Sequence, residues 1–159
     1  MKIYYVQMNS PGGLVPATLL EGLRLRKVDP PDGRVNQRFY RAVGGPWKWT
    51  DRAPWPAETW NDYVSEYQVV TTVLEKREEE IGYAEIMNRE GEVEIVNFGL
   101  LEPFIGRGFG SAALAEVVQF AWKLPGARRL WLHTCDNDHP NALNSYQRRG
   151  FEVYRIERK

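Results

Sequence analysis

The sequence predicts one mixed α/β domain (an α+β fold), built on a single, mostly antiparallel sheet with helices on both of its faces. Its 159 residues are enough for one compact domain and too few for two ordinary domains. Short segments rich in Val, Ile and Thr alternate with turns, and amphipathic helical patterns follow them. We divide the domain 1–159 into an irregular N-terminal part, 1–66, and a regular core, 67–159.

The N-terminal part consists of short segments between Pro- and Gly-rich turns. Lys2–Met8 and Gly22–Val28 have the pattern of strands. Val35–Val43 and Ala57–Tyr67 have helical spacing, with aromatic side chains on one side. We therefore predict two strands and two helices before the core.

The core begins with three strands joined by short, charged turns. They are predicted over Gln68–Glu75, Ile81–Met87 and Glu92–Leu101. Strands joined by such short turns pair with opposite directions, so this segment predicts an antiparallel meander.

Helices and strands alternate after the meander. A helix is predicted from about Gly108 to Leu124, because its apolar residues share one face and Pro125 follows it. The remaining predicted elements are a strand over Arg128–Thr134, a short helix over Pro140–Arg149 with Gly150 at its C-terminal cap, and a strand over Phe151–Ile156.

Composition limits the class of partner. Lys and Arg together number 21, as do Asp and Glu, so no overall field draws the chain toward nucleic acid or an anionic membrane. No apolar segment has the length of a signal peptide or a membrane span, which predicts a cytoplasmic protein. Cys135 is the only cysteine, so no internal disulfide or cysteine-based zinc cluster can form, and we expect no metal site.

A glycine-rich segment joins the third meander strand to the long helix. A strand that leads directly into a helix exposes unpaired backbone N–H groups at the positive end of the helix dipole. Glycines let this backbone come close to an anion, and an arginine can add a cation. The segment predicts a pyrophosphate site at Gly106, Arg107, Gly108, Phe109, Gly110 and Ser111.

The same segment also matches a dinucleotide fingerprint, G-x-G-x-x-A, over Gly108–Ala113, with Asp136 after the next strand. That fold places the fingerprint at the first strand–helix junction of a parallel sheet and needs several βα units after it. Here an antiparallel meander precedes the turn and little chain follows. A nicotinamide-dependent oxidoreductase is therefore disfavoured.

Two segments resemble the signatures of the GNAT superfamily of N-acetyltransferases. The first is Ile105–Gly110, where the family usually has Arg/Gln-x-x-Gly-x-Gly/Ala and this chain begins with Ile105 instead. The second is Tyr146–Phe151, with an aromatic residue before a Gly-Phe pair. Longer strings around them look like one bacterial branch of that superfamily whose acceptors are mostly unassigned. The resemblance implies a GNAT-like fold with splayed central strands and acetyl-CoA as cofactor.

The resemblance also implies how the cofactor arm is held. The family usually has an Asn seven residues before the tyrosine, and this sequence has His139 there. Asn137, Asn141 or His139 itself can supply the polar contact. The pantetheine arm is implied to lie beside the splayed strand, against the backbone of Phe98, Gly99 and Leu100.

Tyr146 matches the family position beside the thioester sulfur, which implies a general acid. A phenol with an ordinary pKa of about 10 stays protonated at neutral pH and can donate to a departing thiolate. The acceptor amine must lose a proton, and Glu94 is the first candidate for the base, ahead of Glu92 and Glu85. By regular alternation, Glu92 and Glu94 are expected to share a facing with Phe98.

Aromatic residues are concentrated in the segment 46–55. We predict that this segment forms a wall of the acceptor pocket, where indole faces receive a cation and a charged residue sets the polarity. The alternative is ordinary packing of the N-terminal helices on the sheet. The residues concerned are Trp47, Trp49, Asp51, Arg52 and Trp55.

Three further residue sets carry weaker signals. His133 and Cys135 share a facing on one strand, but direct transfer needs no covalent intermediate, which disfavours a nucleophilic cysteine. His133, Asp136 and His139 lack the spacing of a metal motif. Asp138 is expected to cap the short helix.

The sequence thus predicts transfer of an acetyl group from acetyl-CoA to a primary amine, borne by a small molecule, an amino acid or a protein N-terminus. A homodimer is a possible assembly. The main alternative is a non-catalytic module that senses acyl-CoA.

Overall fold

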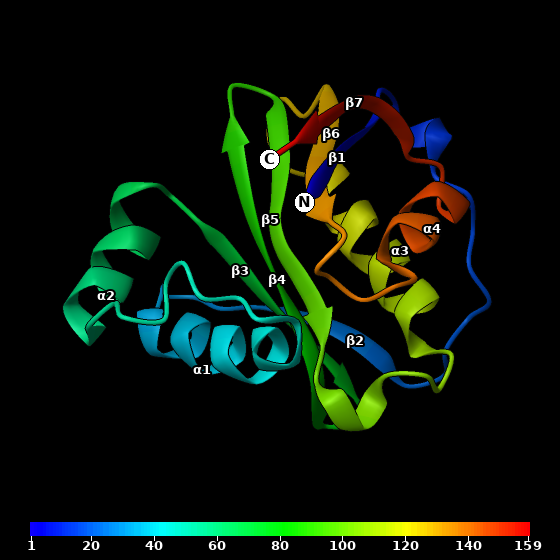
Figure 1. The fold of residues 1–159 in the computed structure, drawn as a ribbon. Coiled ribbons are helices and arrows are strands. Elements are labelled where there is room, and N and C mark those ends of the chain that lie inside the picture. Colours follow the sequence, from blue (N-terminus) through cyan, green and yellow to red (C-terminus); the bar gives the residue numbers. More distant parts are fainter.

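One sheet of seven strands organises the chain, and a computed structural model describes all residues, Met1–Lys159 (Figure 1). The strand order is β2-β3-β4-β5-β6-β1-β7, and every pairing is antiparallel except that of β5 with β6. The strands are β1 (Lys2–Met8), β2 (Leu23–Lys27), β3 (Val70–Lys76), β4 (Glu79–Arg89), β5 (Glu92–Leu100), β6 (Arg129–Cys135) and β7 (Glu152–Arg158).

Helices cover both faces of this sheet, as predicted: α1 and α2 lie on one side, and α3 and α4 lie on the other (Figure 1). None of them is long and apolar enough to cross a bilayer. The predicted order of strands and helices is confirmed. The helices are α1 (Gly33–Gly44), α2 (Ala57–Glu66), α3 (Phe109–Trp122) and α4 (Ala142–Arg148), with short 3-10 helices at η1 (Pro11–Gly13), η2 (Gly45–Trp47) and η3 (Glu102–Phe104).

The main core lies between the sheet and α3. Leu114, Val117 and Val118 share one face of α3 and are fully buried against the sheet. Burial of each such side chain contributes about 1.5–3 kcal/mol relative to exposure. The apolar face predicted for this helix therefore anchors it on the sheet and fixes the position of its N-terminus.

Aromatic residues dominate the packing on the opposite face. Phe39 of α1 stacks on Tyr83 of β4, with ring centroids 5.0 Å apart. Trp60 of α2 is 1% exposed and packs against Tyr40 of α1. At Gly33 an added Cβ would lie 2.5 Å from the backbone of Trp60, so only glycine lets α1 and α2 approach this closely.

A β-bulge interrupts β5 near its middle. Glu85 of β4 is opposite Asn97, but the next residue of β4, Ile86, is opposite Ile95. Val96 is therefore an extra residue, and such a bulge reverses the alternation of side chains after it.

The reversal decides which side chains share a facing. Glu94, before the bulge, is opposite Met87, which packs with the α1 and α2 aromatics. Phe98, after the bulge, packs against the core on the α3 side. The expectation that Glu94 shares a facing with Phe98 is therefore wrong, because regular alternation does not continue through Val96.

The central strands β5 and β6 separate, as predicted. Their parallel pairing extends only from Glu92, opposite Arg129, to Glu94, opposite Trp131. Beyond this point β5 keeps β4 as its neighbour on one edge. Its other edge, over 95–100, has no strand beside it.

Candidate functional site

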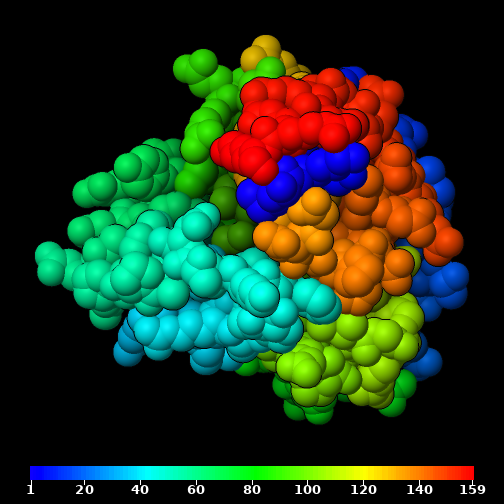
Figure 2. Space-filling model, viewed as in Figure 1, coloured from blue at the N-terminus to red at the C-terminus, as the bar shows by residue number.

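A cleft of about 1020 Å³ opens where β5 and β6 separate. Its walls come from both strands, the glycine turn, the loop after β6 and the loop after α1. Figure 2 shows the surface hollowed between the loop after α1, the first residues of the chain and the loop after β6. A volume near 1,000 Å³ is at the upper end for small-molecule sites, which suits a long ligand.

The glycine turn forms one end of this cleft. Gly106 and Gly108 have φ of 78° and 80°, and an added Cβ would meet nothing within 4 Å. The left-handed backbone, and not crowding, therefore favours glycine at both positions. No side chain caps α3, and its first turn has no acidic residue. Its first N–H groups are thus available to an anion, and the geometry fits a pyrophosphate cradle.

Most residues predicted to hold the cofactor do line this cleft. Arg107 and Phe109 do not: the Arg107 guanidinium lies over the rings of Phe104, at 5.6 Å, and Phe109, at 4.9 Å. Arg107 therefore stacks on the outside of the turn. The predicted residues that line the cleft are Phe98, Gly99, Leu100, Ile105, Gly106, Gly108, Gly110, Ser111, Asn137, His139 and Asn141.

The free edge of β5 forms one long wall of the cleft. From Ile95 to Leu100 its backbone groups on this edge have no strand partner, so they can pair with an extended molecule as a strand would. A Cβ at Gly99 would lie 2.3 Å from Val43 Cγ1, so glycine here lets β5 pack closely on α1. The wall fits an extended arm.

Tyr146 extends from α4 into the cleft. Its ring packs edge-on against Phe151, with centroids 6.0 Å apart. Burial raises the pKa of the Tyr146 hydroxyl above the usual value near 10, and the nearby Asp138 carboxylate adds to this rise. The phenol therefore stays protonated across the physiological range and can act as a donor.

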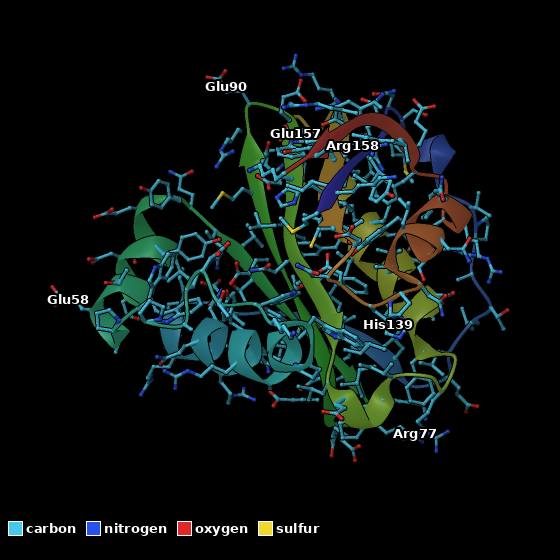
Figure 3. All side chains as sticks on the ribbon, in the orientation of Figure 1. Glu58, Arg77, Glu90, His139, Glu157 and Arg158 are labelled. Carbon is cyan, nitrogen blue, oxygen red and sulfur yellow. The ribbon has the colours of Figure 1, made fainter.

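Three polar residues of the loop after β6 were candidates for contact with the cofactor arm. His139 is near α4 (Figure 3), where its Nδ1 accepts a hydrogen bond from the Asn141 backbone N–H at 3.0 Å and its ring packs against Trp47. Asn137 Nδ2 contacts Met1 Sδ at 3.4 Å. The Asn141 side-chain amide has no partner within the chain, which makes it the most available of the three.

Asp138 has a different role from the predicted helix cap. Its Oδ2 accepts from Thr134 Oγ1 at 2.6 Å and from the Cys135 N–H at 3.0 Å, and its Oδ1 accepts from Trp49 Nε1 at 3.2 Å. No side chain caps α4. The cap prediction is wrong, because the carboxylate is used to tie the loop after β6 to the loop after α1.

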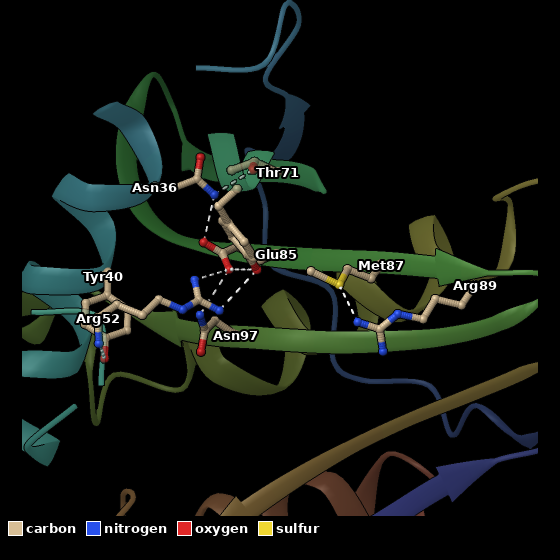
Figure 4. Close-up of polar contacts among 9 residues, drawn as sticks. Asn36, Tyr40, Arg52, Thr71, Glu85, Met87, Arg89 and Asn97 are labelled. Carbon is tan, nitrogen blue, oxygen red and sulfur yellow. Dashed lines mark hydrogen bonds and ion pairs between the residues drawn. The ribbon is translucent and has the colours of Figure 1, made fainter. Parts of the chain in front are cut away.

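Glu85, one of the candidate bases, lies at the centre of a buried network (Figure 4). It is 0% exposed. Its Oε1 accepts from Arg52 Nη1 at 2.9 Å, Tyr63 Oη at 2.9 Å and Asn97 Nδ2 at 3.1 Å. Its Oε2 accepts from Asn36 Nδ2 at 2.7 Å. Both oxygens are engaged, so Glu85 is not placed to receive a proton from a substrate.

The loop after α1 divides into two kinds of residue. Arg52 borders the cleft, but its guanidinium pairs with Glu85 and lies over four aromatic rings, among them that of Trp55 at 5.2 Å. Trp55 packs on Trp60 and does not line the cleft. These two residues serve the packing of the loop. Trp47, Trp49 and Asp51 line the cleft.

Glu94 and Glu92 both lie outside the cleft lining. Glu94 is 9% exposed, and burial raises the pKa of its carboxyl, while the charges of His133, Arg89 and Arg52 oppose the rise. Glu92 forms an exposed ion pair with Arg128 and a partly buried one with Arg129. Of the two, only Glu94 is in an environment that changes its chemistry.

The structure adds cleft residues that the sequence did not suggest as ligand contacts, namely Tyr5 of β1 and His133 of β6. Their rings are 5.5 Å apart, because Tyr5 is directly opposite His133 in the sheet. Only the pairing of the first strand with β6 brings them together, and local sequence carries no signal for that pairing.

A model of the Acetyltransferase (GNAT) family matches residues 32–151. The chain belongs to this family. In this chain, two of the three glycines of the turn have the open, left-handed backbone that an anion cradle requires. The nicotinamide alternative needs a largely parallel sheet, whereas this GNAT domain has a single parallel pair.

Solved structures share this fold at low sequence identity. A GCN5-related N-acetyltransferase from Kribbella flavida matches with a TM-score of 0.67 at 19% identity, over 96% of this chain and 55% of that one. One from Sphaerobacter thermophilus matches with 0.70 at 20%, over 98% and 49%. An acetyltransferase from Thermus thermophilus matches with 0.59 at 22%, over 82% and 86%. This chain spans about half the length of the first two, and no curated protein matches it.

Proposed function

We propose that the protein transfers an acetyl group from acetyl-CoA to a primary amine by direct transfer. The observation that carries the proposal is one continuous cleft, with an uncapped helix start at one end and the Tyr146 phenol within it. Membership of the GNAT family supports acyl transfer in general. Acetyl-CoA and the amine are our assignment.

The residues that would hold acetyl-CoA follow from the shape of the cleft. Backbone N–H groups at Gly108, Gly110 and Ser111 would bind its pyrophosphate, and the free edge of β5 would pair with its arm. When bound, acetyl-CoA supplies the acetyl group as a thioester. Backbone N–H groups beside the β5 bulge would donate to an oxygen on which negative charge develops.

Tyr146 would hold a proton at its Oη and donate it to the departing thiolate. Its raised pKa keeps that proton in place at neutral pH. The acceptor would enter on the α1 and α2 side, between Trp47 and Trp49, whose indole faces can receive a cationic amine beside Asp51. Glu94 lies on this side but beneath the surface, so it can act only through a group that reaches the cleft.

A thiol-release assay with acetyl-CoA and a panel of primary amines tests the proposal. The panel should include small polyamines, amino acids and peptides with a free N-terminus. We expect CoA release that depends on one class of amine. Tight binding of acetyl-CoA without release for any amine would instead indicate a sensor.

A further inference from the structure

His133 lies where the cleft opens. It follows Trp131 by two residues on β6, and Trp131 is the last residue of β6 that pairs with β5. The His133 side chain is exposed. Residues two apart on a strand share a facing, so His133 points to the same side as Trp131 and its parallel partner Glu94. This is the side of α1 and α2, from which the acceptor would enter.

The imidazole of His133 packs against a neighbouring ring but forms no hydrogen bond within the chain. Its ring packs at 5.5 Å from that of Tyr5, which is the directly opposite residue of β1. No hydrogen bond within the chain engages either of its ring nitrogens. A histidine that packs against a neighbouring ring and whose nitrogens are free is suited to accept a proton.

Other ionisable residues of the cleft are less suited to that task, among them His139, whose Nδ1 already accepts a hydrogen bond and whose ring packs against Trp47. Arg52 and Asp138 are engaged in the contacts described above. Burial raises the pKa of the Cys135 thiol and keeps it protonated. Lys48 is an ammonium group and has no free electron pair. Asp51 is an exposed carboxylate, and carboxylates as a class are weaker bases than imidazole.

We propose that His133 is the base that takes the proton from the acceptor amine, and that the buried Glu94 carboxylate, on the same side of the sheet, stabilises the charged imidazole. The assignment rests on the proposed function. His133 first takes one proton from the ammonium form of the acceptor and passes it to solvent. As the N–C bond then forms and the C–S bond breaks, a second proton goes from the nitrogen to a ring nitrogen of His133, and the Tyr146 proton goes to the sulfur. Exchange with solvent then restores both side chains.

Glu94 is placed to stabilise the imidazolium that forms. It is buried on the same side of the sheet, and the charge of His133 is the foremost of the influences that oppose the rise of its pKa. The other ionisable groups on this side are Tyr5 on β1, Cys135 on β6, and Asp51 and Arg52 of the loop after α1. Strand β7 adds Tyr154, Arg155 and Glu157, which all adjoin Tyr5.

The test compares His133→Gln with Glu92→Gln, which removes a carboxylate that lies outside the cleft lining and pairs with Arg128 and Arg129. For His133→Gln we expect kcat/KM at neutral pH to fall roughly a hundredfold or more. Its pH profile should move to higher pH, because only amine that is already deprotonated can then react. Added imidazole should restore part of the activity of His133→Ala. Glu92→Gln should keep kcat and the wild-type profile.

Two measurements are independent of activity. Calorimetry should give the same acetyl-CoA affinity and thermal midpoint for His133→Gln as for the wild type, because the side chain is exposed and lies away from the glycine turn. The chain has two histidines, so His133→Gln assigns the imidazole proton resonances in an NMR spectrum. The His133 resonance should shift when an acceptor amine is added with CoA present.

The outcomes separate the two proposals. If the wild type releases no CoA with any amine, the proposed function fails and the role of His133 fails with it. If the wild type is active and His133→Gln stays within threefold of it with an unchanged pH profile, only the assignment of His133 is overturned. The same holds if Glu92→Gln produces the same loss and the same shifted profile.

Discussion

The Glu85 network and the glycine turn border the same cleft. They differ in whether their polar groups have partners within the chain. Around Glu85, both carboxylate oxygens accept hydrogen bonds from four side chains of the same chain. At the glycine turn, the start of α3 has no cap from any side chain. The Glu85 carboxylate is fully paired within the chain, whereas the glycine turn leaves its donors available.

This difference separates residues that hold the fold from residues that meet a ligand. A buried charge is tolerated only when partners replace water, so the network must be filled from within. Donors at an exposed helix N-terminus are satisfied by water until an anion replaces it. Substitutions should therefore change stability at the first region and binding or turnover at the cleft.

The largest effect on stability is expected from Glu85→Ala. It leaves the mostly buried Arg52 without its counter-charge, and removal of one partner from a buried pair costs about 3–5 kcal/mol. The free energy of unfolding in urea measures this cost. Glu80→Ala is the matched control, because Glu80 is on the same strand but its pair with Arg38 is partly exposed, and about 1 kcal/mol or less is expected. Equal losses of unfolding free energy in the two variants would show that the buried network stabilises the fold no more than a partly exposed ion pair does.

Tyr146→Phe should be the next largest change and should affect turnover alone. Loss of the proton donor is expected to lower kcat about a hundredfold, which corresponds to about 2.7 kcal/mol, with little change in the thermal midpoint. Because burial raises the pKa of this phenol, the wild type should keep its donor as pH rises to about 10 and lose it only above that. A kcat within a few-fold of the wild type would remove Tyr146 from the mechanism.

Gly108→Ala should have a smaller effect on stability and a clear effect on binding. A Cβ at a φ of 80° costs about 1–2 kcal/mol, and relief of that strain would turn the donors away from the cleft. Gly45→Ala is the control, because Gly45 has a φ of −52° and nothing within 4 Å of an added Cβ. Titration calorimetry with acetyl-CoA should show weaker binding for Gly108→Ala only. Equal affinities would argue against a role of the turn in the site.

The smallest effect is expected from Glu94→Gln. The pKa of Glu94 is raised in the folded state, so its charged form is disfavoured there, and its contribution to stability is lost as pH rises through the folded pKa. The neutral variant should be more stable by less than about 1 kcal/mol at neutral pH, and the gain should vanish at acidic pH. Unfolding curves at the two pH values measure it. A loss of stability at neutral pH would mean that its attraction to Arg89 and His133 outweighs burial.

The sequence was sufficient for the order of strands and helices, because those patterns are local. The apolar face of α3 and the glycine turn were both evident from residue spacing alone. The face of the sheet on which Glu94 lies was not evident from the spacing, because the bulge at Val96 depends on how β5 pairs with β4. A single extra residue reversed the expected side.

The contacts of the candidate site depended even more on tertiary structure. Asp138 has the sequence position of a helix cap, but Trp49, far away in the sequence, competes for its carboxylate. Arg52 was expected to face an acceptor, but a fully buried Glu85 on another strand pairs with it. Such partners are distant in the sequence, and a single sequence contains no signal that joins them.

The short pairing between β5 and β6 has a thermodynamic consequence. Only three residue pairs connect the four strands β2–β5 to the three strands β6, β1 and β7, so the sheet is close to being two sheets. A molecule that lies in the gap and bonds to both sides would join them. Ligand concentration would then enter the folding equilibrium directly, adding about 2.7 kcal/mol of stability at a hundred times its Kd.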